Sequence, residues 1–158
     1  RRRRVAGGRT LIRAARPDEG ERLREIAAAA KGHWGYPPAR VEAWAAELDL
    51  SPDRLRASEA VVAEIDGRVI GWAEVVSPVA GVSVLEHLWV EPVSMGAGVG
   101  SGLFRRASET ARALGAHVME WEAEPNALGF YAKMGGRRVR TTTSEWGREL
   151  AVMAVDLT

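Results

Sequence analysis

A glycine-rich turn in the middle of the chain has the composition of a phosphate-binding site. Residues 95–102 read Met-Gly-Ala-Gly-Val-Gly-Ser-Gly and lie between a strand-like segment and a helix-like one. Glycines let a phosphate approach the backbone closely, and a helix N-terminus offers unpaired N–H groups with partial positive charge. The alternative is a plain turn whose small residues serve only tight packing. The alternation of glycines favours a cradle for a pyrophosphate.

Two common phosphate motifs do not fit this turn. A Walker A loop requires Gly-Lys-Ser/Thr, and neither lysine of the chain lies here. The dinucleotide fingerprint Gly-x-Gly-x-x-Gly fails in both frames, because its third glycine falls on Ser101 or Leu103. Glu120 and Glu122 are at a tolerable distance for the ribose-binding acid of that fingerprint. The antiparallel strands expected before the turn nevertheless make a nucleotide-binding protein of another fold the weakest interpretation.

Hydrophobic periodicity predicts the elements that must position the turn. Helical spacing follows Pro17, Pro37-Pro38 and the glycine turn itself, and a short helix is expected at 126–134. Ser51-Pro52 resembles a cap followed by a first-turn proline and predicts one more short turn. Alternating apolar residues predict strands over 10–14, 59–65, 68–76, 82–90, 117–123, 137–142 and 149–157. The strand–helix–strand order around the turn implies that 82–90 and 117–123 form one parallel pair. We therefore expect an α/β (α+β) fold, with a mostly antiparallel mixed sheet of about six to seven strands, one central parallel pair and about four helices.

The same residues resemble the GNAT superfamily of N-acetyltransferases. The run at 88–103 looks like that family's acetyl-CoA motif, which is a strand, a proline and Gln/Arg-x-x-Gly-x-Gly/Ala leading into a helix. The matching positions are Met95, Gly98 and Gly100. Segment 130–135, Phe-Tyr-Ala-Lys-Met-Gly, resembles the family's Tyr-x-x-x-Gly, and the order of elements matches from about residue 10 to the end.

The resemblance implies an acyltransferase with one domain over residues 10–158, preceded by a basic flexible tail over 1–9. It would move an acetyl group from acetyl-CoA to a primary amine of a small molecule or peptide, by direct attack in a ternary complex and without a metal. A longer acyl-CoA is an alternative donor. Another interpretation is an acyl-CoA-binding sensor with the same fold and no turnover. Met95 in place of the family's glutamine or arginine, and Glu124 in place of its usual asparagine, favour that interpretation; Gly136 also replaces a common phenylalanine.

The resemblance also assigns roles to residues. The amides of the turn would hold the pyrophosphate, and exposed strand backbone before it would polarise the thioester carbonyl. The coenzyme-binding residues would be Leu88, Trp89, Val90, Met95, Gly96, Ala97, Gly98, Val99, Gly100, Ser101 and Asn126. Asn126 is equally suited to cap the short helix that follows it. Tyr131 would donate a proton to the leaving thiolate, or else be a structural tyrosine at the edge of the core.

The acceptor amine must lose a proton before it can attack. An alkylammonium has a pKa near ~10.4, so roughly one molecule in a thousand is neutral at pH 7, and a positioned base contributes typically ~10²–10⁴-fold. Glu86 is the expected base, because it lies on the strand that carries the acetyl-binding backbone. An ordinary strand carboxylate is the alternative. His87 is a weaker candidate, and Glu122 or Glu124 could act through water.

Two segments that combine aromatic, polar and glycine residues could wall an acceptor pocket, as the corresponding regions do in similar enzymes. One is His33-Trp34-Gly35-Tyr36 between the first two helices, and the other is 144–148 in the last hairpin loop. The expected substrate contacts are His33, Trp34, Tyr36 and Trp146. The first segment could instead be only a packed turn between helices. The tryptophans expected to serve packing are Trp44, Trp72 and Trp121.

Composition limits the partners and the compartment. The 158 residues carry a net charge of +1 and no cysteine, which excludes a disulfide framework and thiolate metal sites. The near-neutral charge argues against nucleic-acid binding. No apolar run approaches the ~18 residues that a membrane span needs. We expect a cytoplasmic protein whose partner is an amine acceptor, with neither nucleic acid nor membrane, and whose last hairpin offers a place for homodimer pairing.

Overall fold

A computed structural model describes residues 9–158, and within this range it confirms the expected fold class. The described chain forms five α-helices and one mixed sheet of seven strands with the order β1-β2-β3-β4-β5-β7-β6. The helices are α1 Gly20–His33, α2 Pro38–Ala46, α3 Pro52–Ala57, α4 Val99–Ala113 and α5 Leu128–Lys133. The strands are β1 Leu11–Ala14, β2 Glu59–Ile65, β3 Arg68–Val75, β4 Val82–Val90, β5 Val118–Ala123, β6 Arg137–Thr143 and β7 Glu149–Asp156.

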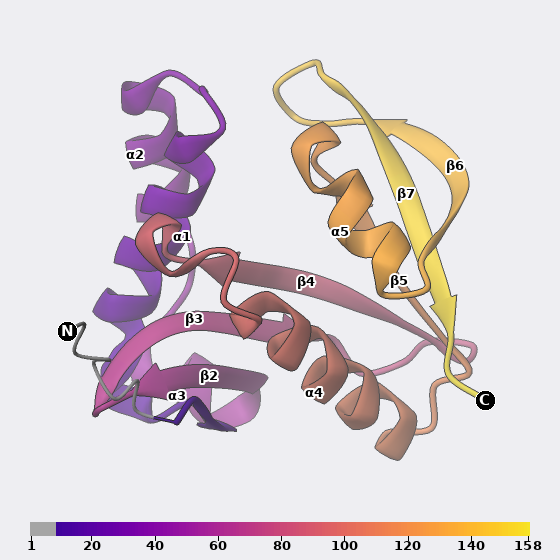
Figure 1. Ribbon diagram of the computed structural model, residues 1–158, viewed down its shortest axis with the longest axis horizontal. Helices are drawn as coiled ribbons and strands as arrows, with labels where there is room; N and C mark the ends of the chain where they lie inside the picture. Colours follow the sequence, from indigo (N-terminus) through magenta and orange to yellow (C-terminus); the bar gives the residue numbers. More distant parts are fainter. Residues whose placement is uncertain (1–8) are drawn as a thin grey trace, which may run out of the picture. The chain divides into compact units, whose positions relative to one another are not determined.

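Two compact units make up the described chain. Strands β3 and β4 and helix α4, which Figure 1 labels, each contribute residues to both units. The first unit comprises the residues up to Glu74 together with His87–Arg106. The second comprises Val75–Glu86 and Ala107–Thr158. All but one residue of the tail expected over 1–9 lies outside the described residues, and the predicted domain bounds stay a prediction.

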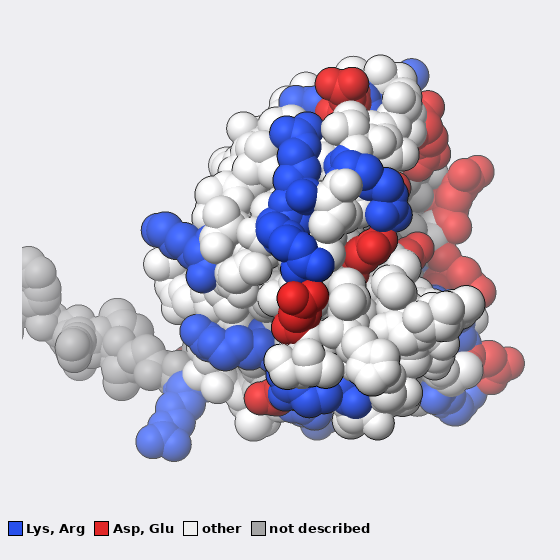
Figure 2. Space-filling view, turned by 90° about the vertical axis from the view of Figure 1, so that its right-hand side faces the viewer, with Lys and Arg blue, Asp and Glu red and all other residues white. Residues whose placement is uncertain are grey.

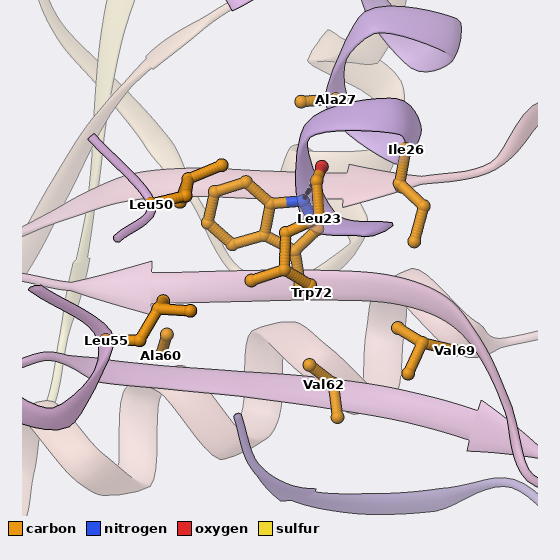
Figure 3. Packing of buried hydrophobic residues seen from close by; sticks show 9 residues of the cluster. All are labelled: Leu23, Ile26, Ala27, Leu50, Leu55, Ala60, Val62, Val69 and Trp72. Atoms are coloured by element: carbon orange, nitrogen blue, oxygen red, sulfur yellow. Dashed lines mark hydrogen bonds between the residues drawn. The ribbon is translucent and has the colours of Figure 1, made fainter. Parts of the chain in front are cut away.

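The first unit has its core between α1 and the β2–β3 hairpin (Figure 3). Asp66 and Gly67 both have positive φ, 52° and 79°, which is the backbone conformation that a tight two-residue hairpin requires. Trp72 of β3 is fully buried, and its indole N–H donates to the Leu23 carbonyl of α1 at 2.9 Å. The apolar stripe of α1 and the inner face of the hairpin therefore form one packed layer, with the tryptophan's polar atom satisfied.

The second unit contains the parallel pair. Val82–Val84 of β4 lie in register with Val118–Glu120 of β5, which confirms the parallel pairing expected from the sequence. β7 then runs antiparallel between β5 and β6. Trp121 of β5 is buried, and Trp72 is buried in the first unit, so both are packing residues as expected.

Exposed arginines line the edge strand β6. Figure 2 views the side on which β6 and β7 lie in Figure 1, and basic side chains form a band over it. Arg137 pairs with Asp156 of β7 at 3.1 Å, and Arg140 pairs with Glu120 of β5 at 2.9 Å. These pairs connect β6 to its neighbours through charges that remain in contact with solvent, so each contributes little free energy.

Candidate functional site

The glycine turn joins β4 to α4 through a short 3-10 turn, η2 Pro92–Ser94. Gly96 and Gly98 have φ values of 85° and 83°, a region that residues with a Cβ rarely occupy. A Cβ added at either glycine would meet no atom within 4 Å, so this backbone is open to a ligand. The Gly102 N–H donates to the Gly98 carbonyl at 3.1 Å. The N–H groups before Gly102 in the first turn of α4 have no acceptor within the helix, so they can donate to a bound anion.

Met95 contributes less to this turn than its place in the motif suggests. Its N–H already donates to the Pro92 carbonyl at 3.2 Å, which closes the 3-10 turn. Its thioether also lacks the hydrogen-bond donors that a glutamine or arginine would offer. We therefore expect the amides from Gly96 onward to carry most of the contact with a phosphate.

A buried carboxylate anchors the segment that leads into the turn. Glu91 accepts two hydrogen bonds from Arg68, at 2.5 and 2.8 Å, and one from Arg22 at 2.8 Å. The Ser94 hydroxyl donates to the same carboxylate at 3.1 Å. Burial by itself raises the pKa of Glu91, but the hydrogen bonds from Arg68, Arg22 and Ser94 outweigh it and leave that pKa below its ordinary value. This group, called the Glu91 brace below, holds the start of the turn with charged hydrogen bonds.

His87 sits among tryptophans in the first unit. Its ring lies 4.7 Å from that of Trp72, and its Nδ1 accepts a hydrogen bond from the Trp89 indole at 2.9 Å. Burial lowers the pKa of His87 to about 4, helped by the positive charges of Arg54 and Lys31. The ring is therefore neutral at physiological pH, with its proton on Nε2 and its basic nitrogen already used. This geometry argues against His87 as the base that deprotonates the acceptor amine.

Lys31 occupies a box of three aromatic rings in the first unit. Its Nζ lies 4.5 Å from the ring centroid of Trp44, 5.1 Å from that of Tyr36 and 5.8 Å from that of Trp89. Trp44 and Trp89 meet edge to face, with ring centroids 5.3 Å apart. Sequence reasoning did not find this group: Trp44 was expected to serve packing alone, and it is only partly buried against the core.

The segment expected to wall an acceptor pocket follows α1 directly. His33 ends the helix and its ring contacts that of Trp34 edge to face at 4.8 Å. Gly35 has a φ of 89°, and its N–H donates to the Gly32 carbonyl. Of the three expected substrate contacts here, Tyr36 is the one that the structure places beside Lys31. The structure does not test whether any of them contacts a substrate.

Tyr131 lies in α5 of the second unit and is 8% exposed. Its ring packs against Trp121 at 5.0 Å and Phe130 at 5.1 Å. Burial raises the pKa of Tyr131, and the negative charge of Glu124 raises it further. The phenol therefore keeps its proton at physiological pH, as a hydrogen-bond donor must.

The expected capping role of Asn126 is wrong. Asn126 lies inside a 3-10 turn, η3 Pro125–Ala127, and α5 begins two residues later with Ala127 at its N-cap and no side-chain cap. Pro125 starts this turn, which moves the helix start past the asparagine. Asn126 is exposed, and its coenzyme contact stays a prediction.

The last hairpin loop has defined internal contacts. The Ser144 hydroxyl accepts hydrogen bonds from the N–H groups of Trp146 and Arg148, and the Ser144 N–H donates to the Arg148 carbonyl at 2.7 Å. Arg148 forms an ion pair with Glu124 at 3.9 Å. Glu124, one of the alternative bases, is therefore held by a positive charge. Trp146 is partly buried, and its expected role against a substrate stays a prediction.

Glu86 is exposed near the middle of β4. Strand alternation puts it on the same face as Val84, which is 39% exposed, whereas Ser83 and Leu85 on the other face are buried. Its carboxylate is therefore accessible to a substrate, as is that of the exposed Glu122. Among residues 9–158 no group of histidines and acids is arranged to hold a metal ion. No helix of this range is both long and apolar enough to cross a membrane.

The fold and the order of its elements are those of a known family. The chain matches the Acetyltransferase (GNAT) family over residues 20–136, and it belongs to this family of acyltransferases. No curated protein matches the chain significantly.

Solved structures share this fold over nearly the whole chain. A GCN5-related N-acetyltransferase from Rhodopseudomonas palustris superposes with a TM-score of 0.80 at 24% identity, covering 97% of this chain and 99% of that one. PaiA N-acetyltransferase from Thermoplasma acidophilum, solved with coenzyme A, has a TM-score of 0.80 at 20% identity, covering 94% and 99%. YncA from Salmonella typhimurium, solved with acetyl-CoA, has a TM-score of 0.71 at 22% identity, covering 96% and 95%.

Proposed function

We propose that the protein transfers an acetyl group from acetyl-CoA to a primary amine of a small molecule or peptide, by direct attack in a ternary complex. The observation that carries this proposal is the open glycine turn at the N-terminus of α4, with two glycines at positive φ, in a member of the GNAT family. Coenzyme A in the PaiA structure and acetyl-CoA in the YncA structure support the choice of co-substrate.

The turn would hold the pyrophosphate of the coenzyme. The amides of Gly96–Ser101 are the proposed donors, with the Glu91 brace keeping the preceding segment in place. A helix N-terminus adds a partial positive charge at this point. When bound, acetyl-CoA supplies the activated thioester. The backbone of Leu88–Val90 is proposed to position and polarise the thioester carbonyl.

Glu86 is proposed to take the proton from the acceptor amine. It is accessible on β4, four residues before the end of the strand, whereas His87 is neutral with its basic nitrogen occupied by Trp89. A carboxylate is a weak base toward a free ammonium. Glu86 would therefore accept the proton, directly or through water, as the neutral amine attacks and its nitrogen becomes acidic.

Tyr131 is proposed to stabilise the leaving thiolate. Because burial raises the pKa of Tyr131, its hydroxyl stays protonated and able to donate. A thiol has a pKa near ~8.5, so complete transfer of the phenolic proton to the thiolate would be uphill. We therefore expect a hydrogen bond from the hydroxyl to matter more than full proton transfer.

Calorimetric titration with acetyl-CoA tests the proposal, with NAD and ATP as controls. Micromolar binding of acetyl-CoA alone, followed by amine-dependent release of coenzyme A, is the expected result. Binding without release of coenzyme A over a broad amine series would instead support an acyl-CoA sensor. No binding by a folded sample would overturn both.

A further inference from the structure

The aromatic box around Lys31 is built for a cation. An ammonium within about 6 Å of an aromatic ring face is attracted by the negative potential of that face. Tyr36, Trp44 and Trp89 all lie within this range of the Lys31 Nζ. The walls come from three separate segments, namely the turn after α1, helix α2 and strand β4. The box therefore exists only in the folded protein and holds its own ammonium.

The walls are also held in position from behind. The Trp89 indole donates to His87, and the His87 ring rests on Trp72, whose own indole donates to Leu23 in the core. Trp44 is fixed by its edge-to-face contact with Trp89. A rigid wall loses little entropy when a ligand binds, so this packing suits recognition. Lys31, which occupies the box, is less rigid than the three aromatic walls, because its ammonium is carried on a flexible four-carbon stem.

All four side chains of the box are partly exposed, so solvent reaches it. Trp89 lies within the strand backbone proposed to position the thioester. The reacting nitrogen of an acceptor must be neutral, whereas the box favours a positive charge. A ligand in the box would therefore be a group other than the reacting amine.

We propose that the box formed by Tyr36, Trp44 and Trp89 is a recognition site for a second, non-reacting ammonium group of the acceptor, and that Lys31 occupies it until the acceptor displaces it. The assignment to an acceptor rests on the proposed function. The substrate class is an amine that carries a further cationic nitrogen. Amines of similar length whose second group is neutral or acidic would gain no binding affinity from the box.

Tetramethylammonium chloride is the probe, because it carries the charge without a reactive nitrogen. Its binding is measured by tryptophan fluorescence in the absence of coenzyme, with tert-butanol as the uncharged probe of similar shape. Lys31→Met should bind tetramethylammonium at least roughly tenfold more tightly than the wild type, because the internal competitor is gone. Lys133→Met, which removes the only other lysine, is the matched control and should behave as the wild type. Adding Trp44→Leu to Lys31→Met should abolish the gain.

A second measurement needs no variant. With ¹³C-labelled lysine the wild type gives ε-methylene signals from two residues only. The aromatic rings should move the Lys31 signal upfield, and tetramethylammonium should return it toward the position of a solvated lysine. If the signal does not respond, and Lys31→Met binds no better than Lys133→Met, the box is a permanent structural clamp and the proposal is wrong.

These results are independent of the acetyl-CoA titration. Displacement of Lys31 together with acetyl-CoA binding supports the acceptor assignment, which then predicts a lower KM for a linear diamine than for the monoamine of equal length. Equal KM values would overturn it. Displacement of Lys31 in a protein that does not bind acetyl-CoA would keep the ammonium site and overturn its link to an acceptor.

Discussion

Each unit of the molecule buries one titratable ring against a tryptophan, and the two rings are kept neutral in opposite ways. His87 lies 4.7 Å from Trp72 with the positive charges of Arg54 and Lys31 acting on it, and Tyr131 lies 5.0 Å from Trp121 with the negative charge of Glu124 acting on it. In both cases burial is the larger effect and the neighbouring charge adds to it. The pKa of His87 falls to about 4, and that of Tyr131 rises.

The difference lies in what the neutral ring can still do. His87 offers its basic nitrogen to Trp89 and so becomes a structural acceptor. Tyr131 retains a proton, so it can act as a donor toward a thiolate. A neutral buried ring is thus no sign of catalysis by itself. The first unit also depends on charged hydrogen bonds at the Glu91 brace, whereas Tyr131 is surrounded by aromatic packing.

The largest effect expected is on the pH dependence of stability, through His87. In the unfolded chain His87 has a pKa of 6.5 and binds a proton below that pH. In the folded protein its pKa is about 4, so it binds a proton only below that pH. Stability from this group is therefore complete above pH 6.5 and falls, by at most roughly 3 kcal/mol, as the pH drops through the lowered pKa of about 4. His87→Gln keeps an acceptor for Trp89 and should flatten urea-unfolding free energies between pH 6.5 and 4. An unchanged slope in a folded variant would show that His87 is not the titrating group.

The glycine turn should be the next most sensitive feature. Gly98→Val forces a β-branched residue into φ 83°, where it is strained, and places a side chain in the space proposed for the pyrophosphate. We expect acetyl-CoA affinity to fall roughly a hundredfold, about 2.7 kcal/mol. Gly67→Val is the matched control, because it has a similar φ of 79° in the β2–β3 hairpin. Equal losses of coenzyme affinity in the two variants would mean that strain alone, and not the cradle, is responsible.

Disturbing the Glu91 brace should lower the free energy of unfolding more than disturbing an exposed ion pair. Glu91→Gln leaves Arg22 and Arg68 without their shared carboxylate, and we expect unfolding free energy to fall by about 2 kcal/mol, since Arg68 remains solvated. The KM for acetyl-CoA should rise as the turn loosens. Asp156→Asn breaks the exposed pair with Arg137 and serves as the control, with a change within about 0.5 kcal/mol. Similar losses in both variants would contradict the brace.

Tyr131→Phe should have the smallest of these effects, as a selective loss of rate. It removes only the hydroxyl, so the ring keeps its contacts with Trp121 and Phe130. We expect kcat to drop at least tenfold, about 1.4 kcal/mol, with coenzyme affinity nearly unchanged. Steady-state kinetics together with acetyl-CoA titration measure the two quantities. An unchanged kcat would make Tyr131 a structural residue like His87.

Local pattern was enough to predict most of the fold. Alternation and helical spacing located every strand and four of the five helices of residues 9–158 to within a few residues, whereas α3 was expected only as a short turn. Asp66-Gly67 identified the β2–β3 hairpin, because turn chemistry is a property of adjacent residues. The order strand–helix–strand also predicted the parallel pairing of β4 with β5, because a helix packed on the sheet returns the chain to the edge at which the first strand began. Asn126 failed as a cap because a proline next to it favoured a 3-10 turn first.

What the sequence by itself determined, then, is the set of elements, the glycine turn and the family resemblance. Only the tertiary structure brought Arg22 and Arg68 onto Glu91, 69 and 23 residues away, and gathered three rings around Lys31. It also left Glu86 exposed and made His87 a neutral ring whose Nδ1 accepts a hydrogen bond from Trp89. Such contacts depend on strand register and on how helices pack against a sheet, and the spacing of residues along the chain does not encode those distances.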